Sequence, residues 1–249
     1  MGTTLCVANP KGGVGKTTTS VNLADGLAKS GKRTLLVDLD PHCSATQALG
    51  LVPPDRHPFM LLEAAGDFAT PSKSDFFAFC PSSSSYREMD LLAQCSEDVL
   101  GVLSAQFESC AERFDYIVLD CPSSLGALQQ AVLAHSREVL IPIECEYFAM
   151  EGLTEMIHLI RDVMNYKNRE LDFGGILLTK YDESLESSGV VEAEIREFFG
   201  EVVFDTVIPK DAVTCEAFYS GNTILDYAPR SRIARAYVEL SMEVIDREQ

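Results

Sequence analysis

The sequence predicts an α/β fold, a doubly wound and mostly parallel sheet with helices on both faces. Short continuous apolar runs recur along the chain, and such runs are typical of strands buried on both faces. Helical stretches separate the runs, and a repeated strand–helix pattern builds parallel crossover units. A glycine-rich loop joins the first run to the first helical stretch. We expect residues 1–249 to form one domain, because α/β folds of about 200–250 residues often do.

Seven apolar runs predict the strands, and the run that precedes Asp120 is a clear example because no polar residue interrupts it. The predicted strands cover residues 3–8, 34–38, 76–80, 116–120, 139–143, 174–179 and 203–208. Stretches of helical periodicity predict helices over residues 16–30, 98–113, 125–134, 151–166, 190–199 and 231–246. Residues 50–86 contain five prolines and a run of serines, which predicts an irregular excursion from the same domain.

Composition excludes several classes of protein. The formal net charge is −18, which argues against nucleic-acid binding by bulk electrostatics, because counterion release needs surface Lys and Arg. No apolar run approaches the roughly 18 residues of a membrane helix, and we expect no signal peptide. The eight cysteines include no Cys-x-x-Cys pair, which argues against a metal framework or a disulfide framework. We therefore expect a cytoplasmic protein.

The loop after the first predicted strand carries the strongest chemical signal. Strand, glycine-rich loop and helix follow one another here, which is the context of a phosphate-binding P-loop. Glycines let backbone N–H groups converge on phosphate oxygens, and the helix N-terminus adds partial positive charge. The residues predicted to bind nucleotide are Lys11, Gly12, Gly13, Val14, Gly15, Lys16, Thr17 and Thr18. In a P-loop, Lys16 reaches the β- and γ-phosphates and Thr17 holds Mg²⁺.

This loop departs from the standard pattern in an informative way. Pro10 replaces the first glycine, and Lys11 adds a second lysine. The run Lys-Gly-Gly-Val-Gly-Lys-Thr-Thr resembles the deviant Walker A motif of the ParA/MinD ATPases. The resemblance implies a dimer that sandwiches ATP, in which Lys11 crosses the interface to the partner's nucleotide. It also implies that the protein binds ATP, ADP and Mg²⁺ and hydrolyses ATP slowly, with Lys11, Lys16 and Asp40 as catalytic residues.

Three aspartates end apolar runs, where a parallel sheet presents its carboxyl edge to ligands. They are Asp38, Asp40 and Asp120. The segments around them resemble further motifs of the same family. That resemblance implies that Asp40 holds the attacking water, that Asp38 lies near Mg²⁺, and that Asp120 stands behind the metal.

Later segments of the chain extend the resemblance. Residues 142–152 resemble the switch-like segment before the family's interface helix, with Glu144 in place of a usual Gln. Pro209 and Asp211 match positions that touch the adenine, although Asp211 replaces a usual Asn. His42 also replaces a usual Gln. It is either a base near the attacking water or a solvent-facing turn residue, and we expect the turn residue.

The resemblance favours a ParA-type ATPase that partitions chromosome or plasmid DNA with a ParB-like activator. ParA-type proteins bind nonspecific DNA, and the candidate contacts here are Arg230, Arg232 and Arg235. Residues 182–205 contain eight acids and one arginine, which opposes DNA binding. The resemblance also allows positioning of a protein cargo without strong DNA binding. If the chain binds DNA, we expect it at the nucleoid.

Two other classes fit the sequence less well. A MinD-like membrane cycle needs a basic amphipathic helix at the C-terminus. The last predicted helix is acidic, so we expect it to pack on the core and not on a membrane. A metabolic or electron-transfer relative would need a second substrate site or iron–sulfur spacing, and the sequence offers neither.

Overall fold

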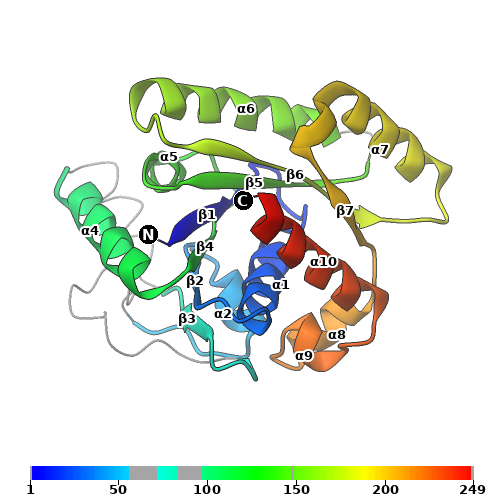
Figure 1. The fold of residues 1–249 in the computed structure, drawn as a ribbon, viewed down its shortest axis with the longest axis horizontal. Helices are drawn as coiled ribbons and strands as arrows, with labels where there is room; N and C mark the ends of the chain where they lie inside the picture. Colours follow the sequence, from blue (N-terminus) through cyan, green and yellow to red (C-terminus); the bar gives the residue numbers. More distant parts are fainter. Residues whose placement is uncertain (1, 56–71, 84–96, 147–148, 248–249) are drawn as a thin grey trace.

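A computed structural model describes residues 2–55, 72–83, 97–146 and 149–247. Seven strands form one sheet in the order β3-β2-β4-β1-β5-β6-β7 (Figure 1). The strands are β1 (Thr3–Val7), β2 (Thr34–Asp38), β3 (Phe77–Cys80), β4 (Tyr116–Asp120), β5 (Glu138–Glu144), β6 (Asp172–Tyr181) and β7 (Val203–Pro209). Every neighbouring pair of these strands is parallel, so the predicted doubly wound fold is confirmed.

The helices cover both faces of this sheet (Figure 1). One face carries α4 (Glu97–Arg113), α5 (Ala127–Ala134), α6 (Ala149–Tyr166) and α7 (Glu186–Phe199). The other carries α1 (Lys16–Lys29), α2 (Ser44–Ala48), α8 (Val213–Tyr219), α9 (Ile224–Tyr227) and α10 (Arg232–Arg247). Each group of helices packs with the sheet into its own apolar core.

Alternation along the central strands explains these two cores. In β2, Leu35 and Val37 point into the core beneath α4 and α5, while Leu36 points into the core beneath α1. All five residues of β2 are buried, as are all five of β4. Strands that are apolar on both faces must be covered on both faces, which is why the continuous runs predicted a parallel sheet.

Short helices were missing from the sequence-based prediction. The predictions did not include α2, α8 and α9, which have five, seven and four residues. Such segments span at most about two turns, too few for a 3.6-residue period to repeat. The predicted excursion at 50–86 contains β3, and the remainder of it lies partly outside the described residues.

The last helix packs on the core, as the sequence predicted. In α10, Ile233, Tyr237, Leu240 and Val244 are buried against the sheet and α1. The apolar side of α10 is therefore occupied by the protein itself. Within the described part of the chain, no helix has the length and apolar content to cross a membrane.

Side chains of α10 form hydrogen bonds with backbone groups of the edge strand β7. The Glu243 carboxylate of α10 accepts hydrogen bonds from the backbone N–H groups of Asp205 (2.7 Å) and Thr206 (3.0 Å). Arg247 donates to the carbonyl of Val203 at 3.0 Å and pairs with Glu243 at 2.8 Å. An edge strand normally presents such groups to solvent or to another strand. Here α10 satisfies three of them.

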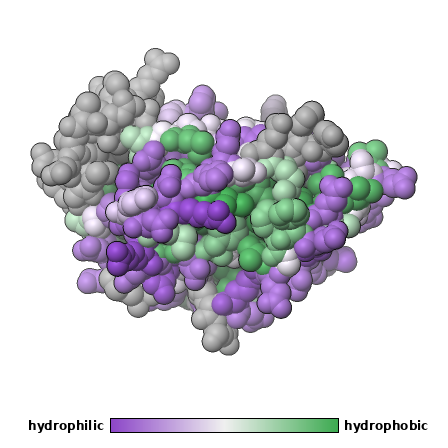
Figure 2. Space-filling view, turned by 90° about the horizontal axis from the view of Figure 1, so that it is seen from above, coloured by the Kyte–Doolittle hydropathy of each residue, from purple (hydrophilic) through white to green (hydrophobic). Residues whose placement is uncertain are grey.

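The surface over α6 and α7 is mixed in character. Seen from that side, hydrophilic residues surround a hydrophobic area (Figure 2). These two helices contribute the exposed apolar side chains of Tyr166, Val190 and Phe198. Acidic residues such as Glu194 and Glu197 of α7 are exposed beside them. This combination differs from the basic surface that a polyphosphate backbone requires.

Candidate functional site

The loop between β1 and α1 is shaped to receive an anion. Gly13 and Gly15 have φ angles of 78° and 91°, in the left-handed region that glycine adopts without strain. Gly15 is the N-cap residue of α1, and no side chain caps this helix. The first N–H groups of α1 therefore lack a side-chain partner at its positive end, where phosphate oxygens bind well.

Neighbouring strands hold the loop in place. Asn9 donates through Nδ2 to the carbonyl of Pro142 at 2.8 Å and accepts from the N–H of Lys11 at 2.9 Å. The hydroxyl of Thr179, at the end of β6, lies 2.8 Å from the carbonyl of Val14. Because β5 and β6 supply these contacts, the loop is fixed by the sheet as well as by its own glycines.

The start of α6 lies directly against the loop. A Cβ at Gly152 would lie 3.2 Å from Asn9 Oδ1 and 3.4 Å from Lys11 Cβ, so only glycine fits there without displacement. Among the described residues, the Lys11 ammonium group has no hydrogen-bond or ion-pair partner. Lys11 thus lies against the start of α6 and carries a positive charge that none of the described residues neutralises.

Lys16 lies inside the loop and is buried. Its ammonium group donates to the carbonyl of Lys11 at 3.0 Å and to the hydroxyl of Ser123 at 2.7 Å. Burial lowers the pKa of Lys16, and the negative charge of Asp120 opposes that effect. A buried cation held by two neutral oxygens gains a stronger partner when phosphate enters the loop.

Asp120 is buried at the end of β4, below the first turn of α1. Its Oδ1 accepts from the Ser20 hydroxyl at 2.9 Å, whereas its Oδ2 is buried without a hydrogen-bond partner among the described residues. Burial raises the pKa of Asp120 to about 8, helped by the charge of Asp38, while the Thr17 hydroxyl lowers it. An unsatisfied buried carboxylate oxygen beside a threonine hydroxyl fits a divalent cation nearby.

The protein supplies few direct ligands for that cation. No group of three His, Cys, Asp or Glu side chains in the described ranges is arranged to hold a metal ion. Mg²⁺ usually keeps several waters and takes phosphate oxygens as ligands, with one or two protein groups. The Thr17 hydroxyl, with Asp120 behind it, is the arrangement that suits such an ion.

Asp38 is fully buried and holds the turn after β2. Its Oδ1 accepts from the N–H of Asp40 at 3.0 Å, and its Oδ2 accepts from the N–H and hydroxyl of Thr46 at 2.8 and 2.7 Å. Burial raises the pKa of Asp38. Both carboxylate oxygens are therefore bonded to the chain, so Asp38 faces any metal less openly than Asp120 does.

Asp40 lies closer to the surface and is held on both oxygens. Oδ1 accepts from the backbone N–H of His42 at 2.9 Å and contacts its ring nitrogen Nδ1 at 3.0 Å. Oδ2 accepts from the Ser44 hydroxyl at 3.0 Å. Cys43, in the same turn, has a φ of 56°, an unusual conformation for a residue with a side chain.

The residues predicted to touch adenine end β7 and follow it. Pro209 is the last residue of β7. The Asp211 carboxylate accepts from the N–H of Val213 at 3.1 Å and from Arg232 Nε at 3.2 Å. Arg232 also donates to the carbonyl of Lys210 at 2.5 Å. This arginine, predicted as a DNA contact, is therefore engaged within the chain.

The carboxyl edge of the sheet thus brings together the phosphate loop and the three strand-end aspartates. The sequence did not single out the hydroxyl groups that hold them, on Ser20, Thr46, Ser123 and Thr179. Ser20 alone had a local signal, because it lies four residues after Lys16 on the same side of α1. Glu144, at the end of β5, pairs with Lys180 at 3.1 Å.

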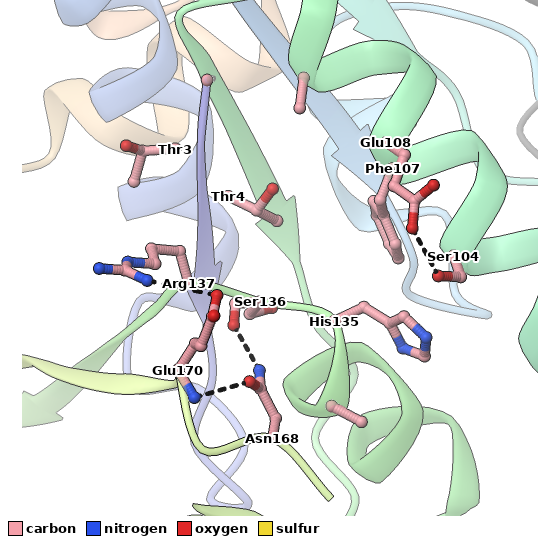
Figure 3. Close-up of a pocket in the computed structure, with 13 residues that line it drawn as sticks. Thr3, Thr4, Ser104, Phe107, Glu108, His135, Ser136, Arg137, Asn168 and Glu170 are labelled. Atoms are coloured by element: carbon pink, nitrogen blue, oxygen red, sulfur yellow. Dashed lines mark hydrogen bonds and ion pairs between the residues drawn. The ribbon is translucent and has the colours of Figure 1, made fainter.

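A separate cleft of about 530 Å³ lies at the opposite, amino end of the strands (Figure 3). Its polar groups bond mainly to one another. Asn168 donates to the Ser136 carbonyl at 2.7 Å and accepts from the N–H of Glu170 at 3.0 Å. Glu170 also lies 3.6 Å from Arg137. This cleft is remote from the phosphate loop and takes no part in that site.

Comparison with known proteins agrees with this geometry. Residues 2–173 match the family model described as an AAA domain. The chain is 38% identical over 251 residues to the sporulation initiation inhibitor protein Soj of Bacillus subtilis, covering 98% of both chains. It is 39% identical over 246 residues to the chromosome-partitioning ATPase Soj of Thermus thermophilus, covering 98% of this chain and 96% of that one.

A solved structure supports the same assignment. Cobyrinic acid a,c-diamide synthase from Mycobacterium smegmatis, with bound ADP and magnesium, is 27% identical and has a TM-score of 0.83. The match covers 100% of this chain and 96% of that one. The predicted ADP and Mg²⁺ agree with the ligands in that structure, and the same enzyme has been solved with an ATP analog and magnesium. The fold, the phosphate loop with its second lysine, and the full-length similarity show that the chain belongs to the ParA/MinD family of P-loop ATPases.

Proposed function

We propose that this chain is a ParA-type ATPase whose ATP-dependent dimer drives the partitioning of chromosome or plasmid DNA. The observation that carries this proposal is Lys11 of the phosphate loop, whose Cβ lies against Gly152 of α6 and whose ammonium group has no partner among the described residues. The full-length relatives named as chromosome-partitioning proteins support the same function. The seven strands of one sheet support a single ATPase domain.

Each site residue has a distinct role in this proposal. Lys16 and the N–H groups of residues 12–18 hold the phosphates. Thr17 ligates Mg²⁺, with Asp120 behind it and Asp38 fixing the adjacent turn. Asp40 orients the attacking water, and Pro209 and Asp211 border the adenine. Catalysis of this kind consists mainly of positioning and charge stabilisation, which a rigid strand-end cluster can supply.

Size-exclusion chromatography with light scattering tests the ATP-dependent dimer. With Mg²⁺ and ATP, we expect a dimer that returns to monomer as ATP is hydrolysed. Asp40→Ala is expected to keep ATP bound and to remain dimeric, because binding and pairing do not need the water-orienting carboxylate. A protein that stays monomeric with ATP in both forms would overturn the sandwich dimer.

DNA binding is the part of the proposal that the chain supports least. Arg230 and Arg235 are exposed, but Arg232 is engaged by Asp211. Glu183, Glu192 and Glu239 line the cleft beside Arg232 and Arg235, and carboxylates repel phosphate. These contacts favour a second candidate function, the positioning of a protein cargo without strong DNA binding.

A DNA titration with ADP and with ATP at several salt concentrations separates the two functions. ATP-dependent binding that weakens steeply with salt supports DNA partitioning, because each phosphate contact releases counterions. An absence of binding at low salt supports protein-cargo positioning. In either case we propose a ParB-like activator with a basic segment, suited to the acidic surface, and a cytoplasmic or nucleoid location.

A further inference from the structure

The turn after β2 contains a histidine whose ring has little to do with packing. The His42 side chain is 87% exposed, whereas that of Asp40 is 12% exposed. Nδ1 of the ring nevertheless lies 3.0 Å from Asp40 Oδ1. An ionised carboxylate can only accept hydrogen bonds, so Nδ1 must carry the hydrogen that joins the two side chains.

Backbone hydrogen bonds fix the turn that carries Asp40 and His42. The N–H of Cys43 donates to the carbonyl of Asp40 at 2.9 Å, and the φ of 56° at Cys43 closes the turn. Gln47 donates to the carbonyl of His42 at 3.1 Å. Conformations of this kind persist where the surrounding contacts enforce them, and they concentrate at functional sites.

The three donors divide the Asp40 carboxylate between them. The backbone N–H and the ring of His42 both donate to Oδ1, and the Ser44 hydroxyl donates to Oδ2. The backbone N–H anchors Oδ1 and the Ser44 hydroxyl anchors Oδ2. The ring adds a second donor direction at Oδ1, and so further limits rotation of the carboxylate plane. A carboxylate that must orient a water molecule needs this restriction.

We propose that His42 is a positioning residue for ATP hydrolysis, which fixes the Asp40 carboxylate through its ring Nδ1–H. The proposal rests on the proposed role of Asp40. His42 does not bind nucleotide, and it adds little to folding because its ring is exposed. Its loss should therefore slow turnover without weakening ATP binding or stability.

Steady-state ATPase kinetics and thermal unfolding of the full chain test this proposal. His42→Ala is expected to lower kcat by about threefold to tenfold, the usual effect of one neutral hydrogen bond, with KM and Tm unchanged. His42→Gln keeps an N–H donor and should recover most of the lost rate. His135→Ala, at a histidine beside the remote cleft at the amino end of the strands, is the matched control and should keep the wild-type kcat.

The outcomes separate this proposal from the one on which it rests. Unchanged turnover in His42→Ala overturns the proposal, as does a loss of rate that accompanies a lower Tm or that His42→Gln fails to restore. A raised KM with an unchanged kcat also overturns it, because it would place His42 in binding. If Asp40→Ala hydrolyses ATP at the wild-type rate, the role of Asp40 itself is wrong. If Asp40→Ala is inactive while His42→Ala is normal, only the inference about His42 fails.

Discussion

Replacing Thr179 by valine should weaken both the fold and the phosphate loop. Thr179 is buried, and its hydroxyl lies 2.8 Å from the Val14 carbonyl and 3.1 Å from the Ile143 carbonyl. Valine fills nearly the same volume, so the main change is a buried carbonyl without its donor. That costs about 1–3 kcal/mol in the free energy of unfolding. At roughly 2–4 °C per kcal/mol for a chain of this size, Tm should fall by several degrees.

The effect on nucleotide follows from the position of Val14 within the loop. A loop that loses its anchor must be ordered by ATP, and a cost of about 1.4 kcal/mol in binding weakens affinity about tenfold. Thermal unfolding over a series of MgATP concentrations measures both quantities, because ligand raises Tm according to its affinity. Thr179→Ser retains the hydroxyl and should bind ATP as the wild type does.

Thr154→Val serves as the control at an exposed position, where the hydroxyl donates to the carbonyl of Met150 in the same helix. The reasoning is refuted if Thr179→Val binds MgATP as tightly as wild type and unfolds at the same temperature. It is also refuted if Thr154→Val produces the same losses, because the effect would then not depend on the loop.

Three further predictions follow from the same site and its surroundings. Lys11→Ala should bind MgATP yet remain monomeric and inactive in chromatography and turnover assays, and an unchanged turnover rate would remove Lys11 from the mechanism. Asp120→Asn should raise the free energy of unfolding of the ligand-free protein at pH 7 by about 1–2 kcal/mol, because burial raises the pKa of Asp120 to about 8 and folding then requires its carboxyl to take up a proton, which asparagine does not need. It should also abolish Mg²⁺-dependent hydrolysis, whereas a lower free energy of unfolding would contradict the protonation argument. Burial opposes a low pKa for Asp226, but hydrogen bonds from a backbone N–H and from Lys29 hold its pKa below the ordinary value of 3.8. The stability it contributes is present above that ordinary value and is lost as the pH falls through the lowered pKa. The free energy of unfolding of Asp226→Asn, measured in urea, should thus fall less steeply between pH 6 and 3 than that of the wild type. The same pH dependence in both proteins would count against this ion pair.

Much of the fold could be predicted because its strands are apolar on both faces. The predicted bounds of β2 and β4 coincide with those in the structure. Strand β6 extends two residues beyond its prediction at each end, and at its carboxyl end it continues through Lys180, whose φ is 51°. Its lysine and tyrosine break the apolar run, while pairing with β7 continues to Tyr181. Pairing with a neighbouring strand, and not the apolar pattern, therefore determines where β6 ends.

The candidate site was predictable to a similar depth. A phosphate loop and strand-end acids can be identified from short local sequence patterns. Because parallel strands end at one edge, these patterns also predict that the residues lie together. The groups that hold them come from distant segments, such as Thr179, which lies 165 residues from Val14. Nothing in the sequence around Thr46 or Ser123 indicates that each would contact a site residue. For His42, the expected solvent exposure is confirmed, but its bond to Asp40 depends on a turn geometry that the sequence does not encode visibly.

The side chains that occupy β7 also affect how copies of this chain can assemble. A sheet with an open edge can add strands from one molecule after another, and such head-to-tail growth has no natural end. Glu243 and Arg247 already take three of the backbone groups through which the first half of β7 could recruit a strand. The ATP-dependent dimer proposed above, which pairs two copies at the carboxyl edge of the sheet, closes on itself at two copies. Because α10 occupies part of the β7 edge, a high protein concentration should not by itself lead to fibre growth through strand addition at that edge.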